Sequence, residues 1–322
     1  MLLAPSVYRT AAKESLSKAQ KPSRVILIHT GAILLLSLLL AAFDYLLDQQ
    51  ISNTGGLSGL GMRSVLTTIQ SVLRLAEIFA LIFWQMGYTY YALQIARGKD
   101  AGIPSLFEGF RRFGPVLRLR LFTALLVTLA IFVSSYVASA LFMFSPLSNA
   151  MMAELEPLIQ PNMDEAAIME VMLPLLEANA VPILILFGLC FLGCGLFLFC
   201  RYRLAEMWLL DHPDCGALAA LRTSRKLMKG NAKAMLRIDL SYWWFYLLTL
   251  LVTALGLGDT ILDSLGVELT MDAFTHYLVF FSLYAWSHMA LYWWKQNQVS
   301  VTYAHAYLAL CPQEETQETA NV

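Results

Sequence analysis

The chain has 322 residues, of which 58% are hydrophobic and only 14% are charged, and its mean hydropathy is +0.60. An average globular domain has about 25% charged residues, and the core of a chain this long cannot absorb repeated apolar runs of about twenty residues. Composition therefore excludes a soluble domain and a disordered chain. The net charge of −1 says nothing about the kind of partner.

Six apolar segments predict an all-α, polytopic membrane protein. A helix needs about 20 residues to cross a hydrocarbon core of about 30 Å with its backbone groups bonded internally. We expect three helical hairpins in a single domain over residues 1–311, followed by a disordered polar tail over 312–322, and we expect the loop over 145–180 to be partly helical. The predicted spans are 25–47, 73–93, 119–144, 181–200, 240–257 and 273–294.

Basic residues fall on one side of these spans. Of the 22 lysines and arginines, 20 lie before the first span, in the links between spans two and three and between spans four and five, or after the last span. The loops around 145–180 and 258–272 have none. The positive-inside rule therefore predicts that both termini lie in the cytoplasm. Five tryptophans fall near the same interface: Trp208, Trp243, Trp244, Trp293 and Trp294.

The two long cytoplasmic links predict short amphipathic helices at the membrane surface. In the first link, Ser105 and Glu108 have the spacing of a capping box, and Gly114-Pro115 is expected to interrupt the helix. In the second, a helix is expected to begin at Pro213-Asp214 and to end at Gly230-Asn231.

One face of the second predicted helix is basic. Arg222, Arg225, Lys226 and Lys229 follow one another at i, i+3, i+4 and i+7, and we call these four residues the basic stripe. Apolar residues lie opposite, which is typical of an interfacial helix. The stripe predicts contact with anionic lipid headgroups or with a partner protein, although the positive-inside bias alone also explains it. The apolar residues are Ala217, Ala220, Leu221, Leu227 and Met228.

The stretch over 201–241 is the most distinctive in the chain, and it resembles the bacterial membrane family designated domain of unknown function 975 (DUF975). Shorter segments at 12–16, 106–110 and 303–307 (Tyr-Ala-His-Ala-Tyr) are similar to that family as well. The resemblance implies a multi-pass protein of the bacterial cytoplasmic membrane, with six helices and no known activity. A looser likeness is to the non-catalytic membrane domains of glycerophosphodiester phosphodiesterases. The residues that carry the main resemblance are Arg201, Tyr202, Asp211, Pro213, Ser224, Gly230 and Asn231.

No constellation of residues predicts catalysis, a metal site or a cofactor. The five cysteines form no Cys-x-x-Cys pair, and the five histidines lack the spacing of a zinc site. The glycine-rich segment around 56–64 completes neither a nucleophile elbow nor a dinucleotide fingerprint. The basic stripe has no aromatic residues beside it for stacking, so we expect no nucleic-acid partner. The sequence therefore favours a non-enzymatic membrane protein.

A small-molecule or lipid transporter or channel is the alternative. Its polar pathway would be lined by Arg74, Glu77, Gln85 and His288, because polar groups inside spans often mark a substrate route. The competing explanation is structural. Arg74 and Glu77 are one helical turn apart and would pair with each other, and His288 would bond to a neighbouring helix.

Overall fold

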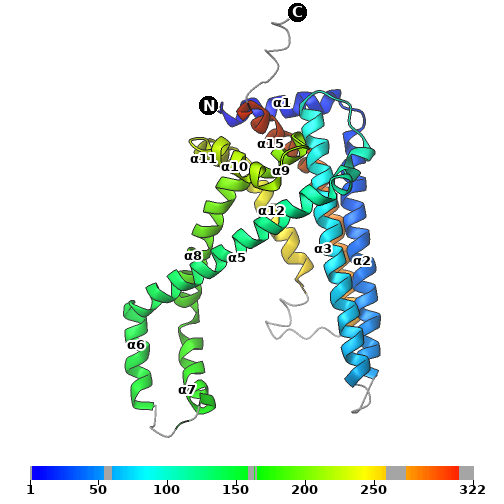
Figure 1. The fold of residues 1–322 in the computed structure, drawn as a ribbon. Coiled ribbons are helices and arrows are strands. Elements are labelled where there is room, and N and C mark those ends of the chain that lie inside the picture. The colour runs from blue at the N-terminus through cyan, green and yellow to red at the C-terminus, as the bar shows by residue number, and fades with distance from the viewer. Residues whose placement is uncertain (1, 54–59, 159–162, 164, 259–272, 312–322) are drawn as a thin grey trace, which may run out of the picture. The chain divides into compact units, whose positions relative to one another are not determined.

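The protein, described here by a computed structural model, is helical throughout the part that the structure describes: residues 2–53, 60–158, 163, 165–258 and 273–311, which contain no strand. The chain divides into two compact units (Figure 1), of which the first joins Met1–Val116 to Leu204–Val322 and the second is Leu117–Arg203. The single domain over 1–311 stays a prediction. The predicted tail over 312–322 and most of the loop over 258–272 lie outside the described residues.

Two long helices of the first unit, α2 (Pro22–Asn53) and α3 (Leu60–Ala96), run antiparallel and pack side by side (Figure 1). They have 32 and 37 residues, hence lengths of about 48 and 55 Å at 1.5 Å per residue, which exceed the hydrocarbon core. Helix α3 begins well before the predicted span 73–93, because no glycine or proline between Gly61 and Gly87 interrupts it.

The last two predicted spans differ most from the structure. Helix α11 (Ala232–Leu240) meets α12 (Trp243–Gly256) at an angle of 63°, so the predicted span 240–257 begins at a bend. Helix α14 (Ala273–Leu291) continues through a π-helical turn, Tyr292–Gln296, into α15 (Asn297–Leu310). The described residues contain four helices long and apolar enough to cross a membrane, or five if the bent pair is one span. The structure thus supports a polytopic membrane protein, but not the count of six spans.

The second unit contains α5 (Phe113–Met143, whose first turn belongs to the first unit), α6 (Pro146–Leu155), a 3-10 turn (Glu156–Leu158), α7 (Glu165–Ala178) and α8 (Ala180–Tyr202). The hydroxyl of Ser145 caps α6 by accepting a hydrogen bond from the Ser148 N–H at 3.1 Å. These helices confirm that the loop over 145–180 is partly helical.

The predicted details of the first link are wrong. A 3-10 helix, η2 (Ile103–Phe107), precedes the short α4 (Glu108–Arg111), and no side chain caps either of them. Gly114-Pro115 does not interrupt a helix but lies in the first turn of α5, where the missing N–H of proline is not needed.

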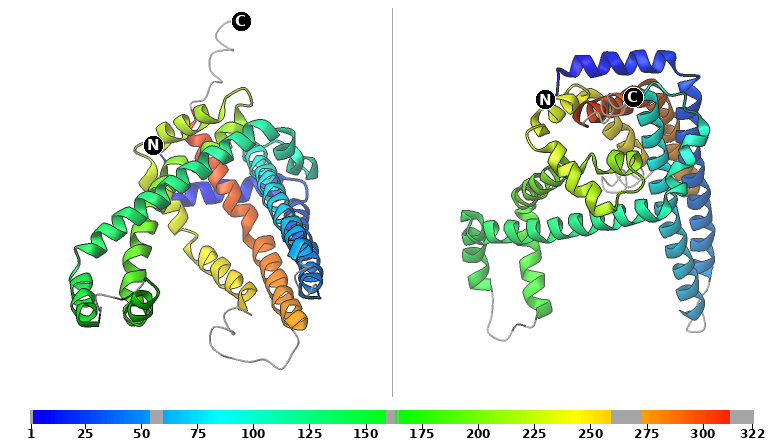
Figure 2. Two further views of the ribbon diagram at one scale, coloured as in Figure 1. Left: turned by 60° about the horizontal axis from the view of Figure 1, so that its bottom comes forward. Right: turned by 45° about the horizontal axis from the view of Figure 1, so that its top comes forward.

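Five helices of the first unit, α1 (Pro5–Lys18), α9 (Ala205–Asp211), α10 (Ala217–Met228), α11 and α15, gather at the end where α2 begins and α3 ends (Figures 1 and 2). We call them the cap helices. A buried apolar cluster holds them together and includes Tyr8 of α1, Met228 of α10, Ile238 of α11 and Tyr307 of α15. Basic residues predicted to be cytoplasmic are concentrated in this cap and in the link beside it.

Candidate functional site at the C-terminal cap helix

Helix α15 is the centre of the cap, and its Tyr-Ala-His-Ala-Tyr segment bonds to three other parts of the chain. Tyr303 and Tyr307 are one turn apart and share a face of the helix, whereas His305 lies on the other side. Each of the three side chains has a partner that is far away in sequence.

Tyr307 contacts a buried ion pair. Its hydroxyl donates to Oδ2 of Asp211 at 2.9 Å, while the guanidinium of Arg97 pairs with Oδ1 of the same carboxylate. The side chain of Asp211 is only 7% exposed, so its charge needs these partners. Burial, and to a smaller extent the charge of Asp211, raises the pKa of Tyr307, which therefore stays a hydrogen-bond donor. Asp211, singled out by the family resemblance, thus joins α9 to α15 and to the end of α3.

Tyr303 forms a second, similar contact with α11. Its hydroxyl donates to a carboxylate oxygen of Asp239, and the hydroxyls of Tyr303 and Tyr246 lie 2.6 Å apart. Burial raises the pKa of Tyr303, as does the neighbouring Tyr246. Two aspartate–tyrosine bonds therefore attach the same face of α15 to the stretch over 201–241.

His305 connects α15 to the N-terminal helix. Its Nε2 lies 2.9 Å from the hydroxyl of Ser15 on α1. Burial lowers the pKa of His305, and a hydrogen bond with the backbone of Ala11 and the charge of Glu14 offset part of that effect. Glu14 is exposed and pairs with Lys18 at 2.7 Å. Segments from the two ends of the chain, both singled out by the family resemblance, therefore meet in the cap.

Other residues of the distinctive stretch shape the α9–α10 hairpin. The buried hydroxyl of Ser224 accepts a hydrogen bond from the Leu204 N–H at 3.2 Å. Gly230, two residues after the end of α10, has φ of +84°, a conformation that favours glycine. Asn231 donates from Nδ2 to the Leu227 carbonyl at 2.9 Å. Their observed roles are structural.

Three motif residues remain. In the second unit, Arg201 lies over the ring of Phe197, 4.5 Å from its centroid, and Tyr202 is half-buried. Pro213 is exposed in the turn before α10.

Every side chain of the basic stripe is exposed, three of them on α10 and that of Lys229 at its C-cap. The opposite face of the helix is buried within the protein, where α10 packs on α9 and Met228 joins the cap cluster. This differs from the interfacial helix expected from the pattern, whose apolar face would enter lipid. The buried residues of α10 are Ala217, Ala220, Leu221, Ser224 and Met228.

The predicted polar pathway falls into two parts: Arg74 lies beside Glu77, whereas Gln85 and His288 both interact with the buried His29 of α2. Arg74 pairs with Asp44 of α2 and, at 3.0 Å, with Glu77, which also accepts a hydrogen bond from Ser37 at 3.2 Å. Gln85 is exposed, and His288 is buried with its ring stacked on Tyr292 at 3.9 Å. The sequence therefore identified the Arg74–Glu77 pair but missed Asp44.

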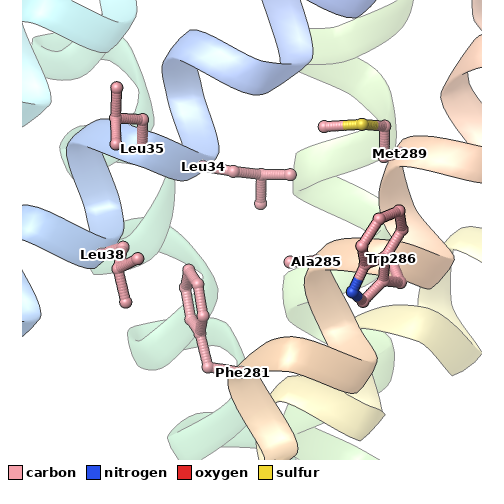
Figure 3. A pocket seen from close by; sticks show the side chains of 7 residues that line it. All are labelled: Leu34, Leu35, Leu38, Phe281, Ala285, Trp286 and Met289. Atoms are coloured by element: carbon pink, nitrogen blue, oxygen red, sulfur yellow. The ribbon is translucent and has the colours of Figure 1, made fainter. Parts of the chain in front are cut away.

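A cavity of about 200 Å³ lies between α2 and α14, and none of the pathway residues lines it (Figure 3). Side chains from both helices point toward it, and its surface is almost entirely apolar. The lining residues are Leu34, Leu35, Leu38, Phe281, Ala285, Trp286 and Met289.

The described residues offer little support for a metal site or a reactive cysteine. Within the ranges that the structure describes, no three His, Cys, Asp or Glu residues lie close enough to hold a metal ion. None of the five cysteines, all of which lie within the described residues, forms a disulfide. Burial raises the pKa of Cys215 and of Cys311, which disfavours the reactive thiolate.

Comparison with known proteins gives a family but no activity. No curated protein and no solved structure matches the chain. The likeness to the membrane domains of glycerophosphodiester phosphodiesterases thus stays a prediction. The family described as "Protein of unknown function (DUF975)" matches residues 7–288, which include Ser15, Asp211 and Asp239 but end before α15. Because this match covers most of the chain, the protein belongs to the DUF975 family.

Proposed function

We propose that this protein is a multi-pass protein of the bacterial cytoplasmic membrane that performs no catalysis and binds anionic lipid headgroups through its cap. The observation that carries the proposal is the geometry of α10. Its apolar face is held by the protein, and its four stripe cations point away from that face and are all exposed. Near an anionic surface each basic side chain adds about 1 kcal/mol, so a fixed row of four is an effective headgroup contact.

Lipid selectivity measured at the protein surface tests this proposal. The full-length protein is reconstituted with spin-labelled phosphatidylglycerol or phosphatidylcholine, and the motionally restricted fraction gives the relative affinity. Replacing the four stripe residues by glutamate is expected to remove most of the preference for phosphatidylglycerol, and the loss should shrink at high salt. The matched control places glutamate at the exposed Lys18 and Lys21, outside the stripe. Unchanged selectivity of the stripe variant contradicts lipid binding and favours a partner protein as the ligand of this surface.

A transporter or channel is the second candidate, and the Asp44–Arg74–Glu77 network favours it. Both carboxylates are largely buried on helices apolar enough to span a membrane, where ionisable groups commonly serve transport. Proton flux into vesicles that contain the protein and a pH-sensitive dye provides the test. A flux that E77Q abolishes supports this function, whereas the absence of flux at every imposed potential counts against a proton pathway.

A further inference from the structure

We propose that Arg9, Lys13 and Lys295, together with the side-chain amide of Gln298, bind the phosphate group of an anionic lipid where α1 meets the junction of α14 and α15. None of these residues belongs to the basic stripe. It consists of three cationic side chains from two elements and one buried amide that has no partner for its N–H groups.

Lys295 lies in the π-helical turn between α14 and α15, and such turns are frequent at functional sites. Its ammonium lies 5.5 Å from the ring centroid of Trp294 and 5.8 Å from that of Trp244. These two rings pack against each other at 5.4 Å. Cation–π contacts of this kind orient a lysine without neutralising it, so the charge remains available to a ligand.

Gln298 supplies the second observation that points to a ligand. Its Oε1 accepts a hydrogen bond from the Lys295 ammonium at 2.9 Å, which leaves Nε2 as a donor beside that cation. Gln298 is only 8% exposed, yet Nε2 has no hydrogen-bond partner. Leaving a buried donor unpaired costs free energy. An anion held by Lys295 would satisfy it.

Arg9 and Lys13 complete the cationic group from α1. They are one helical turn apart, and the Arg9 guanidinium lies 5.6 Å from the ring centroid of Tyr242 in the segment that leads to Trp244. Burial, followed by the positive charges of Lys13 and Arg9, lowers the pKa of Lys295, so the three cations are close enough to repel. None of them forms an ion pair with a described residue, whereas Lys18, Arg97 and Arg112 all do.

The surrounding residues favour a lipid over a soluble phosphate. Trp294, which contacts Lys295, is more than half exposed, and so are Trp243 and Trp293, which adjoin Trp244 and Trp294 in the sequence. Tryptophan rings of this kind settle at the headgroup level of a bilayer. A donor set of two ammonium groups, a guanidinium and an amide matches the oxygens of a phosphate diester. The site would therefore meet a lipid phosphate at the depth where that phosphate lies.

Native mass spectrometry of the delipidated full-length protein in detergent, titrated with phosphatidylglycerol, tests the site. The wild type is expected to retain one phosphatidylglycerol molecule more tightly than phosphatidylcholine. K295Q should weaken retention about fivefold and the double variant R9Q/K13Q about thirtyfold, whereas K295R keeps the charge and should retain the lipid. K18Q is the matched control on α1 and should behave as the wild type.

Further measurements distinguish a lipid from inorganic phosphate as the ligand, and a loss of binding from a loss of folding. Wild-type retention by both K295Q and R9Q/K13Q overturns the site, and so does equal retention of phosphatidylcholine. Inorganic phosphate that binds as tightly as the lipid overturns the assignment to a lipid. Thermal unfolding of each variant is measured first, and if K295Q does not fold, R9Q/K13Q on the exposed side of α1 decides alone. Replacing the four stripe residues by glutamate should leave this lipid bound. The proposal for the basic stripe and the proposal for this site can therefore be refuted separately.

Discussion

At the residue scale, two glycines allow the first link to lie directly on the backbone of α3. A Cβ atom on Gly87 would lie 1.8 Å from the carbonyl oxygen of Leu106, and one on Gly109 would lie 1.9 Å from that of Phe83. Neither carbonyl can retreat without moving a helix. The close approach explains why glycine follows Glu108 in the Leu-Phe-Glu-Gly-Phe segment over 106–110.

Replacement of Gly109 by alanine should therefore separate the link from α3. Overpacking costs about 1–3 kcal/mol where neighbours can shift, and a backbone clash places G109A at the upper end of that range or beyond it. The control is G216A, since a Cβ atom there meets nothing within 4 Å. Thermal unfolding in detergent should show a lower Tm for G109A than for G216A, and equal values would contradict the close contact.

Removal of the Asp211 carboxylate charge should destabilise the cap more than removal of one of its partners. In D211N the Arg97 guanidinium loses its counter-ion and the Tyr307 hydroxyl loses a charged acceptor, which together cost about 1–3 kcal/mol. Y307F removes a single hydrogen bond and should cost about 1 kcal/mol. Chemical unfolding should show a larger loss of unfolding free energy for D211N than for Y307F. A D211N variant that is as stable as the wild type would contradict this order.

His305 makes the stability of the cap depend on pH. Its pKa is lowered in the folded protein, so below the unfolded value of about 6.5 the unfolded chain binds more protons than the folded one. Stability should therefore fall as the pH falls through about 6.5. H305Q, which cannot titrate, should show a smaller drop in Tm between pH 7.5 and pH 5.5 than the wild type. An equal drop in both proteins would assign the pH dependence to other groups.

At the element scale, helix α10 shows what sequence periodicity predicts and what it does not. The basic stripe is exposed, and the helix ends at Met228, two residues before the predicted stop at Gly230. Periodicity identifies an apolar face, but it cannot tell whether protein or lipid covers that face. The α9–α10 hairpin decides this, because α9 covers the apolar side.

The network around α15 could be predicted only in part for a similar reason. The segments that compose it, at 12–16, 201–241 and 303–307, stand out in the sequence. Their pairing does not, because Tyr307 and Asp211 are 96 residues apart and His305 and Ser15 are 290 apart. Arg97 and Asp44 carry no local pattern that assigns their partners, so both were missed.

Deletion of α15 should release α1 from the cap. The two helices pack along each other and share the Ser15–His305 contact. In a chain that ends at residue 296, trypsin is expected to cut at Arg9, Lys13 or Lys18 much faster than in the full-length protein. A chain that ends at residue 311 keeps α15 and serves as the control. Equal cleavage rates would show that α1 is held by other contacts.

At the scale of the whole molecule, the distribution of charge predicts which side of the membrane the cap faces. Lys226 belongs to the exposed stripe, and Asn149 is exposed on α6 in the region that lacks basic residues. In a cysteine-free background, K226C should react with an impermeant maleimide only after cells are opened, whereas N149C should react in intact cells. Labelling of K226C from outside would invert the predicted topology.

The number of spans was harder to predict than their existence. The first four are well anticipated because each is a long apolar run that forms one helix. The last two are not, because Ser241 and Tyr242 lie at a bend and α14 includes Ser282, Ser287 and His288 among its apolar residues. The backbone bends only at the first of these places, whereas α14 is continuous and its polar residues lower its mean hydropathy.

The position of α15 at the centre of the cap also constrains how the protein is made. A ribosome delivers α1 well before α15, so the N-terminal helix waits without this partner while about 280 residues are translated. The cap can close only after α15 has emerged. Any nascent fragment that stalls before residue 297 lacks the Ser15–His305 contact and leaves the side of α1 that packs on α15 uncovered.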